Sequence, residues 1–222
     1  MRYKILSRPS YSLLELELEN GEEVLAEPGA MVYMKNVELS PEIKGGLLSG
    51  LKRSFLGGES FFVNRYVSKG KGLLGLSPSY SGDIAHVKLS GRLYAQSGAF
   101  LASSPDLKID VKWGGAKTFF AGEGLFLLKL EGNGDLFLSS FGGIEEINVD
   151  GTLSVDTGHI VAFEETLNFK IRKAGGLKAT LLSGEGLVAE FAGKGKIWIQ
   201  TRSIAEYVGW LVSLLPKQTG RS

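Results

Sequence analysis

Three glutamates recur at matching places in this chain and are the first candidates for chemistry. Glu59, Glu123 and Glu185 each follow a glycine and open an apolar run, at intervals of 64 and 62 residues. Around a common axis their carboxylates could form a ring that holds a hard cation. The alternative is that each carboxylate accepts backbone N–H bonds in a tight hairpin. Recurrence in every repeat favours this structural role, so we predict no metal site.

Groups for covalent or acid–base catalysis are scarce. The chain has no cysteine, which excludes thiolate catalysis and Cys-based metal sites. His86 and His159 are its two histidines. Asp156 precedes His159 by three residues, so a cryptic hydrolase is one alternative, but no Gly-x-Ser-x-Gly elbow accompanies the pair. We expect His159 to be a hydrogen-bonded strand residue, and we predict no enzyme activity and no cofactor.

Basic residues that precede the glutamate motifs form a second candidate surface. They are Lys52, Arg53, Lys117, Arg172, Lys173 and Lys178. A basic rim could contact the phosphates of lipid head groups or RNA. A net charge of +1 and the lack of interleaved aromatic residues favour solvated loop charge instead, and rank RNA below an anionic membrane surface as a partner.

The elements that must position these residues are β-strands. The chain has 31 glycines but only six prolines, and 43% of its residues are hydrophobic, which predicts an all-β fold with many tight turns. A glycine turn, a short apolar strand, a Gly-Gly pair with a basic residue, and a Gly-Glu motif occur in this order three times. We predict approximate repeats 1–81, 82–143 and 144–201. Since one such unit cannot close its own core, we expect three β units related by pseudo-threefold symmetry, sharing one interior in a single domain, 1–222.

The first repeat shows the expected local pattern. From Tyr11 to Glu19, leucines alternate with glutamates, which is typical of a half-buried strand. Asn20-Gly21 follows, and this dipeptide predicts a type I′ turn that joins two strands of a hairpin.

The chain ends in a predicted helix, 203–216. Ser203 and Glu206 match a capping box, and Pro216 marks the stop. Its apolar arc of about 220° is wider than a surface helix needs. Residues expected to contact another subunit or a membrane are Tyr207, Trp210, Leu211 and Leu214. The helix carries one glutamate and no lysine, so we favour a homo-oligomer.

Several motifs resemble the altered-inheritance-of-mitochondria family of uncharacterised bacterial and archaeal proteins. They are the Gly-Glu hairpins, Asn64-Arg65-Tyr66, Ser81-Gly82-Asp83-Ile84 and the closing segment from Ile197 to Ser203. The resemblance runs from the first strands to Arg202. It implies a fold like that of the tryptophan RNA-binding attenuation protein, in which a β-ribbon bends into a jelly-roll-like unit, with three such units per chain in a pseudo-trimer. Mitochondrial relatives look like factors for inner-membrane organisation, and the family offers no catalytic residues to carry over.

These observations predict a non-enzymatic scaffold or binding module that forms homo-oligomers, with a link to membrane organisation. The alternative is a peripheral binder of anionic lipid or RNA through the basic loops. No small-molecule substrate is identified. The sequence lacks a signal-peptide pattern and an apolar run of about 20 residues, so we expect a soluble, cytoplasmic protein, with a peripheral membrane position as the alternative.

Overall fold

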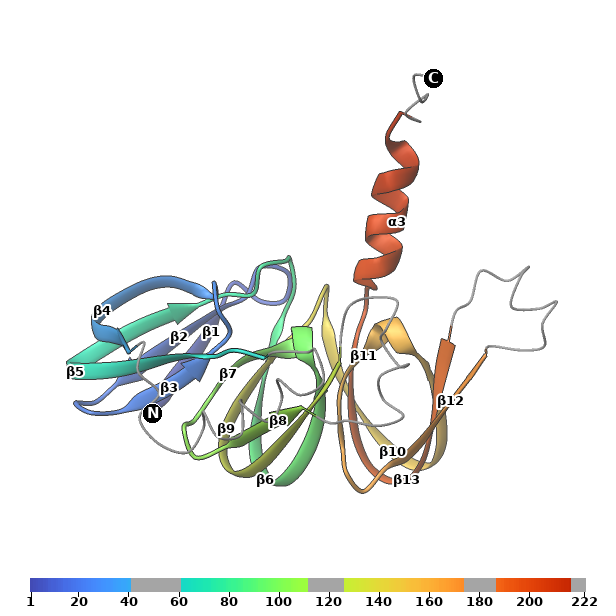
Figure 1. The fold of residues 1–222 in the computed structure, drawn as a ribbon, viewed down its shortest axis with the longest axis horizontal. Coiled ribbons are helices and arrows are strands. Elements are labelled where there is room, and N and C mark those ends of the chain that lie inside the picture. The colour runs from blue at the N-terminus through green and yellow to red at the C-terminus, as the bar shows by residue number, and fades with distance from the viewer. Residues whose placement is uncertain (41–60, 112–125, 174–186, 217–222) are drawn as a thin grey trace.

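The computed structural model describes residues 1–40, 61–111, 126–173 and 187–216. This part of the chain is mostly β-strand, with one α-helix, α3, near its C-terminal end (Figure 1). Its thirteen strands belong to one sheet in which every ladder is antiparallel. The prediction of an all-β fold with a C-terminal helix is confirmed.

The elements follow one another in the chain as strands, two short 3₁₀ turns and the final helix. They are β1 Arg2–Leu6, β2 Leu13–Leu18, β3 Glu23–Ala26, β4 Met31–Ser40, β5 Asn64–Leu76, β6 Ile84–Gln96, η2 Ser97–Ala99, β7 Phe100–Ser103, β8 Lys108–Val111, β9 Leu127–Ser139, β10 Ile144–Asp156, η4 Thr157–His159, β11 Ile160–Glu164, β12 Asn168–Lys173, β13 Leu187–Gln200 and α3 Ile204–Leu214.

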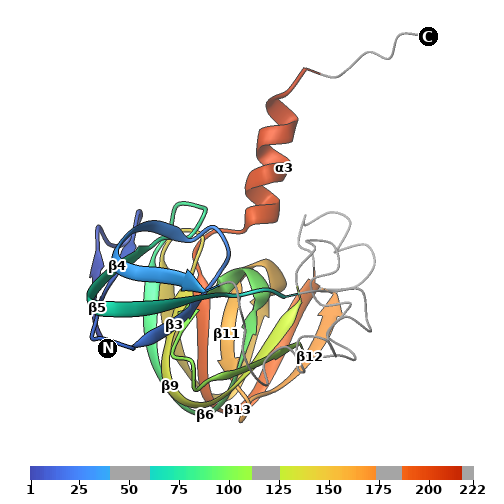
Figure 2. The same ribbon diagram turned by 60° about the vertical axis from the view of Figure 1, so that its left-hand side comes forward.

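Three long strands organise the sheet. β5 pairs with β2, β3 and β4; β9 pairs with β6, β7 and β8; and β13 pairs with β10, β11 and β12. We call these groups the β5, β9 and β13 ladders. They follow one another along the long axis of the molecule, and both views show α3 projecting away from the strands (Figures 1 and 2).

Two joints connect the ladders. At the first joint, β3 of the β5 ladder pairs with β7 of the β9 ladder. At the second joint, β6 of the β9 ladder pairs with β11 of the β13 ladder. The path of paired strands runs from β1 to β10 and has two ends, so the described strands form an open row of ladders.

Paired glycines allow the long hairpins to bend. Gly91 lies opposite Gly132 in the β9 ladder, and Gly151 lies opposite Gly193 in the β13 ladder. All four have φ between +112° and +136°, a region that residues with a Cβ atom rarely adopt. Glycine at such points lets a strand of 13 residues curl over its own core.

The buried side chains form three clusters, one centred on each ladder. In β2 the alternation predicts burial well, because Leu14, Leu16 and Leu18 are buried while the residues between them are partly exposed. The single shared interior expected from the sequence is not confirmed, because the buried side chains of the described residues fall into three clusters. Neighbouring ladders contribute to these clusters: Val161, Ala162 and Trp198 of the β13 ladder join the β9 cluster, and Leu101, Ala102 and Phe137 of the β9 ladder join the β5 cluster.

The turn at Asn20-Gly21 differs from its prediction. Gly21 has a φ of +80°, but Asn20 does not have a positive φ, so the turn is not type I′. The flanking strands β2 and β3 do not pair with each other; both pair with β5. β2 and β3 therefore lie one after the other along β5, with the dipeptide between them. The hairpin prediction is wrong.

Candidate functional site

The most exposed apolar element is α3. Ser203 caps its N-terminus by accepting a hydrogen bond from the Glu206 backbone N–H at 3.3 Å, which confirms this half of the capping box. At the other end Leu215 is extended, as expected for a residue that precedes a proline. None of the residues of α3 is buried. Within the described residues, no helix has the length and hydropathy needed to cross a membrane.

The four predicted contact residues all lie on α3 and are exposed. Their exposed fractions are 46% for Tyr207, 56% for Trp210, 40% for Leu211 and 63% for Leu214. The ring centroids of Tyr207 and Trp210 are 5.8 Å apart. The ring centroids of Tyr207 and Phe141, at the base of the helix, are 5.3 Å apart. The structure thus brings these residues together on one helix and leaves them accessible to a partner.

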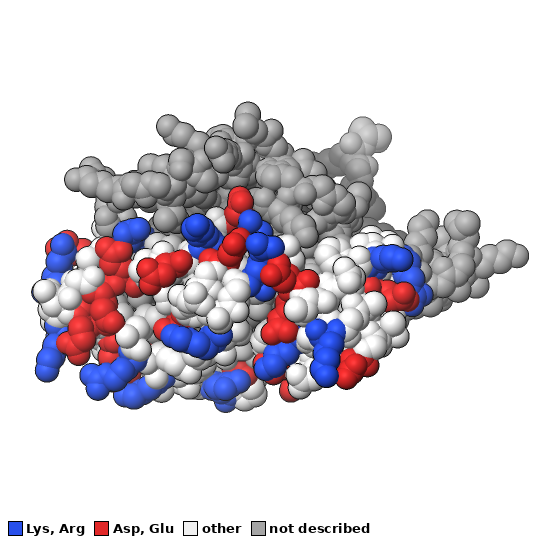
Figure 3. Space-filling model, turned by 90° about the horizontal axis from the view of Figure 1, so that it is seen from below, with Lys and Arg blue, Asp and Glu red and all other residues white. Residues whose placement is uncertain are grey.

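The predicted basic rim is only partly described. Lys52, Arg53, Lys117 and Lys178 lie outside the described residues, and Lys173 is the last residue of β12. Arg172 forms an ion pair with Glu190 at 3.0 Å and donates to the Ser154 hydroxyl at 3.0 Å. On the face shown in Figure 3, basic and acidic side chains are interspersed. Arg172 therefore already has a carboxylate partner within its ladder.

The three recurring glutamates, Glu59, Glu123 and Glu185, also lie outside the described residues. Among the residues that are described, no three side chains of His, Asp or Glu are grouped in a way that could hold a metal ion.

His159 lies in the 3₁₀ turn η4, not in a strand as predicted. Its Nδ1 donates to the Gln200 backbone carbonyl at 2.7 Å. The Asp156 carboxylate instead accepts from the Gly158 backbone N–H at 2.8 Å. Each group thus has a local structural partner, and the arrangement needed by the hydrolase alternative is not formed by Asp156 and His159.

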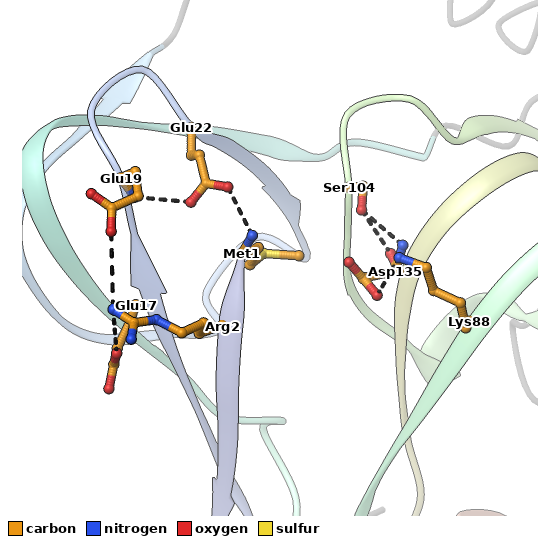
Figure 4. Close-up of polar contacts among 8 residues, drawn as sticks. All are labelled: Met1, Arg2, Glu17, Glu19, Glu22, Lys88, Ser104 and Asp135. Atoms are coloured by element: carbon orange, nitrogen blue, oxygen red, sulfur yellow. Dashed lines mark hydrogen bonds and ion pairs between the residues drawn. The ribbon is translucent and has the colours of Figure 1, made fainter.

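His86 lies in a polar cluster between β1 and β6 that the sequence did not predict. Its Nδ1 contacts the Tyr3 hydroxyl at 2.9 Å, and its Nε2 contacts Asp135 Oδ1 at 2.9 Å. Lys88 donates to the same carboxylate at 3.0 Å, and Ser104 bonds the Asp135 backbone N–H at 2.8 Å (Figure 4). Burial alone would raise the pKa of Asp135, but hydrogen bonds from His86 and Lys88 outweigh it and lower that pKa. The cluster fastens β1 to the β9 ladder.

A second unpredicted feature is Glu27, which lies between β3 and β4 at the first joint. It lines an open cavity of about 340 Å³ together with apolar and small residues: Pro28, Phe61, Phe62, Ser97, Gly98 and Phe126. Its backbone N–H donates to the Leu101 carbonyl at 2.9 Å. Its carboxylate makes no hydrogen bond or ion pair with another side chain in the described part of the chain. Burial raises the pKa of Glu27 to about 7.

Tyr80 lies near this carboxylate. Burial raises its pKa to about 12, and the charge of Glu27 acts in the same direction, while a hydrogen bond with Ser139 opposes both. The Tyr80 hydroxyl donates to the Gly98 carbonyl. Phe61 packs edge to face on Phe100 and Phe126. The cavity can therefore accept an apolar group beside a carboxyl that gains or loses its proton near neutral pH.

We expect Glu27→Gln to remove part of the pH dependence of stability. The pKa of Glu27 is raised in the folded state, so the protonated side chain contributes fully to the free energy of unfolding below the unfolded-state pKa of about 4.3. This contribution is lost as the pH rises through about 7. The variant should match the natural chain at pH 4.5 and melt about 2–4 °C higher at pH 8, the shift that ~1 kcal/mol produces at this size. Thermal unfolding followed by circular dichroism measures both. Glu38→Gln, at an exposed carboxylate paired with Lys69, is the control; an equal shift there would contradict the prediction.

Comparison with known proteins gives a consistent result. The family model described as mitochondrial biogenesis AIM24 matches residues 3–202. An uncharacterised protein of Streptococcus pyogenes serotype M6 is 34% identical over 227 residues, covering 97% of this chain and 92% of that protein. The crystal structure of a Streptococcus pyogenes protein from a structural genomics programme is similar with a TM-score of 0.80 and 34% identity. That similarity covers 96% of this chain and 99% of the other.

Proposed function

The chain belongs to the mitochondrial biogenesis AIM24 family, and from this premise we propose that it is a non-enzymatic scaffold whose copies associate through α3. The observation that supports this is that no residue of the helix is buried, although seven of its eleven residues are large and apolar. A helix that is apolar over most of its circumference is normally covered in the functional state.

A second copy of the chain is the partner that best fits α3. Helices that lie in a membrane interface commonly carry Lys and Arg on a polar face. The one charged residue between Ile204 and Leu214 is Glu206, and its polar side includes Ser213. The helix therefore lacks the cations that would attract an anionic lipid surface. Packing of two such helices buries apolar surface on both without leaving charge unpaired.

Two further predictions from the sequence belong to this proposal. The first is the internal threefold repeat, which is supported by the similar strand pairing in the three ladders, arranged as an open row. The attenuation-protein-like form of each unit is part of the same prediction. The second is a cytoplasmic location with a link to membrane organisation, which is supported by membership of the mitochondrial biogenesis family.

The test is a charge placed at the centre of the apolar arc. Leu211→Glu should weaken self-association at least ~100-fold, since a central interface residue typically contributes 2 kcal/mol or more and a buried unpaired charge adds to the loss. Sedimentation equilibrium over a range of protein concentrations measures this. The matched control is Ser213→Glu on the polar side of the same helix, which should associate like the natural chain.

Two results would count against the proposal. The natural chain could stay monomeric at high protein concentration, or both glutamate variants could associate equally. Co-flotation with anionic liposomes across a salt series identifies the alternative partner: salt-sensitive binding would transfer the role from a second copy to a lipid surface.

A further inference from the structure

The two joints between ladders are built in the same way. At each, a strand of one ladder pairs near its C-terminal end with a short apolar strand of the next ladder that follows a 3₁₀ turn. The paired residues are Leu25 with Ser103 and Ala26 with Ala102 at the first joint, and Tyr94 with Phe163, Ala95 with Ala162 and also Leu93 with Glu164 at the second. The short strands also meet their own long strand with the same register shift, between Phe100 and Ala102 and between Ile160 and Ala162.

β4 has the same local geometry but lacks the joint. Its register on β5 shifts between Met31 and Tyr33, so Met31–Met34 corresponds to Phe100–Ser103 and Ile160–Phe163. Both of the latter segments are completely buried. In β4 the exposed fractions are 42% for Met31, 55% for Val32 and 44% for Met34. Among the described strands, β5 is the only partner of β4.

β10 offers the complementary half of a joint. The glycine pair Gly151 and Gly193 matches Gly91 and Gly132, so Leu153–Val155 corresponds to Leu93–Ala95 of the second joint. In the described part of the chain β10 pairs with β13 alone and ends the path of the sheet. Ser154, which corresponds to the joint residue Tyr94, is exposed.

The backbone of β4 is oriented for such pairing. At the first joint Glu27 donates across to the Leu101 carbonyl, so Leu101 directs its backbone groups toward the neighbouring ladder. Val32 of β4 matches Leu101 of β7, so the backbone N–H and C=O groups of Val32 are expected to point toward the unpaired edge of β4. Those of Met34 are expected to point the same way, because alternate residues of a strand face the same edge. An exposed edge with apolar side chains is a template for another strand.

We propose that the β10 edge of one copy pairs with the Met31–Lys35 segment of β4 in a second copy, in the register Met34 opposite Ser154 and Tyr33 opposite Val155. The two edges lie at opposite ends of the molecule, so they can meet between copies (Figure 1). This inference rests on the proposed self-association and adds a contact between copies that is separate from α3. Because the two surfaces differ, the contact is head-to-tail and generates a ring or a filament.

Introduced cysteines test the register, since the chain has no thiol of its own. Directly opposite residues in a hydrogen-bonded antiparallel pair have Cα atoms about 5.5 Å apart, within the range a disulfide spans. Met34→Cys and Ser154→Cys variants, mixed under mild oxidation, should give a disulfide-linked pair that stops at two chains. The double variant should give a series of longer products on non-reducing gels. Each single variant alone should give little crosslinking.

Thr152→Cys mixed with Met34→Cys is the matched control. Thr152 is also exposed and lies on the same face of β10, two residues from the predicted position, where the Cα separation of about 7–8 Å disfavours a disulfide. Equal crosslinking at Thr152, or in either single variant, would overturn the inference. If the natural chain sediments as an oligomer and the mixture gives no crosslink, the β10–β4 contact is wrong while self-association stands. If the chain is monomeric and no crosslink forms, both proposals fail.

Discussion

Phe163→Ala should lower the free energy of unfolding by about 3–5 kcal/mol, the usual cost of removing a fully buried phenylalanine ring. Phe163 is 0% exposed. Within the β13 ladder its ring centroid lies 5.1 Å from that of Phe169 and 5.0 Å from that of Phe191. It also contacts Tyr94 of β6 at 5.5 Å, across the second joint. The substitution therefore opens a cavity in the buried cluster of the β13 ladder and weakens the contact between the β9 and β13 ladders.

Urea unfolding of the natural and substituted chains at pH 7 measures this loss. Phe62→Ala removes the same ring from a side chain that is 56% exposed, and it should change the free energy by less than about 0.5 kcal/mol. Similar losses for the two variants would show that the second joint is not held by packing around Phe163. A large loss would show how much the buried side chains of β11 stabilise the second joint. That value could then be compared with the proposed β4–β10 contact, where the side chains of β4 are exposed in the single chain.

The strands could be predicted from the sequence because the pattern that specifies them is local. Alternating leucines and glutamates define β2, and glycine marks the positions where the β9 and β13 hairpins need a positive φ. Which strand pairs with which is not local. Asn20-Gly21 has the composition of a hairpin turn, yet both flanking strands pair with β5, from residues 64–76. Turn chemistry fixes a change of backbone direction and leaves the choice of partner to packing.

The same distinction explains which site residues were predicted. The cap at Ser203 and the apolar arc of α3 lie within fourteen residues of sequence, so Tyr207, Trp210, Leu211 and Leu214 could be placed on one exposed helix. Glu27 could not be identified, because its burial depends on phenylalanines about 35 and 100 residues away along the chain. One signal was available in retrospect: Glu27 directly precedes Pro-Gly at the turn into an apolar strand.

Asp83→Ala should lower the free energy of unfolding by about 3 kcal/mol, because it removes the buried carboxylate that accepts hydrogen bonds from the buried Ser12 hydroxyl and Ile84 N–H and from the half-exposed Arg8. The Asp83 side chain is 4% exposed, and Arg8 holds it through two hydrogen bonds of 2.9 and 2.7 Å. Ser12 and the Ile84 backbone N–H donate to the same carboxylate at 2.7 and 2.8 Å. This one side chain thus fastens the segment before β2 to the start of β6, joining the β5 and β9 ladders at a second place in addition to the first joint.

The effect of Asp83→Ala should depend on pH in a defined direction. Burial alone would raise the pKa of Asp83, but the hydrogen bonds from Arg8, Ser12 and Ile84 outweigh it and lower that pKa in the folded state. The stabilisation is therefore fully present above the unfolded value of about 3.9 and is lost as the pH falls below it. Urea unfolding at pH 7 and pH 3 should show the difference between the two chains shrinking at the lower pH. Asp150→Ala, at a carboxylate that is 82% exposed, should show little difference at either pH. A constant difference for Asp83→Ala would mean that its loss comes from packing and that the ionised carboxylate does not fasten the two ladders together.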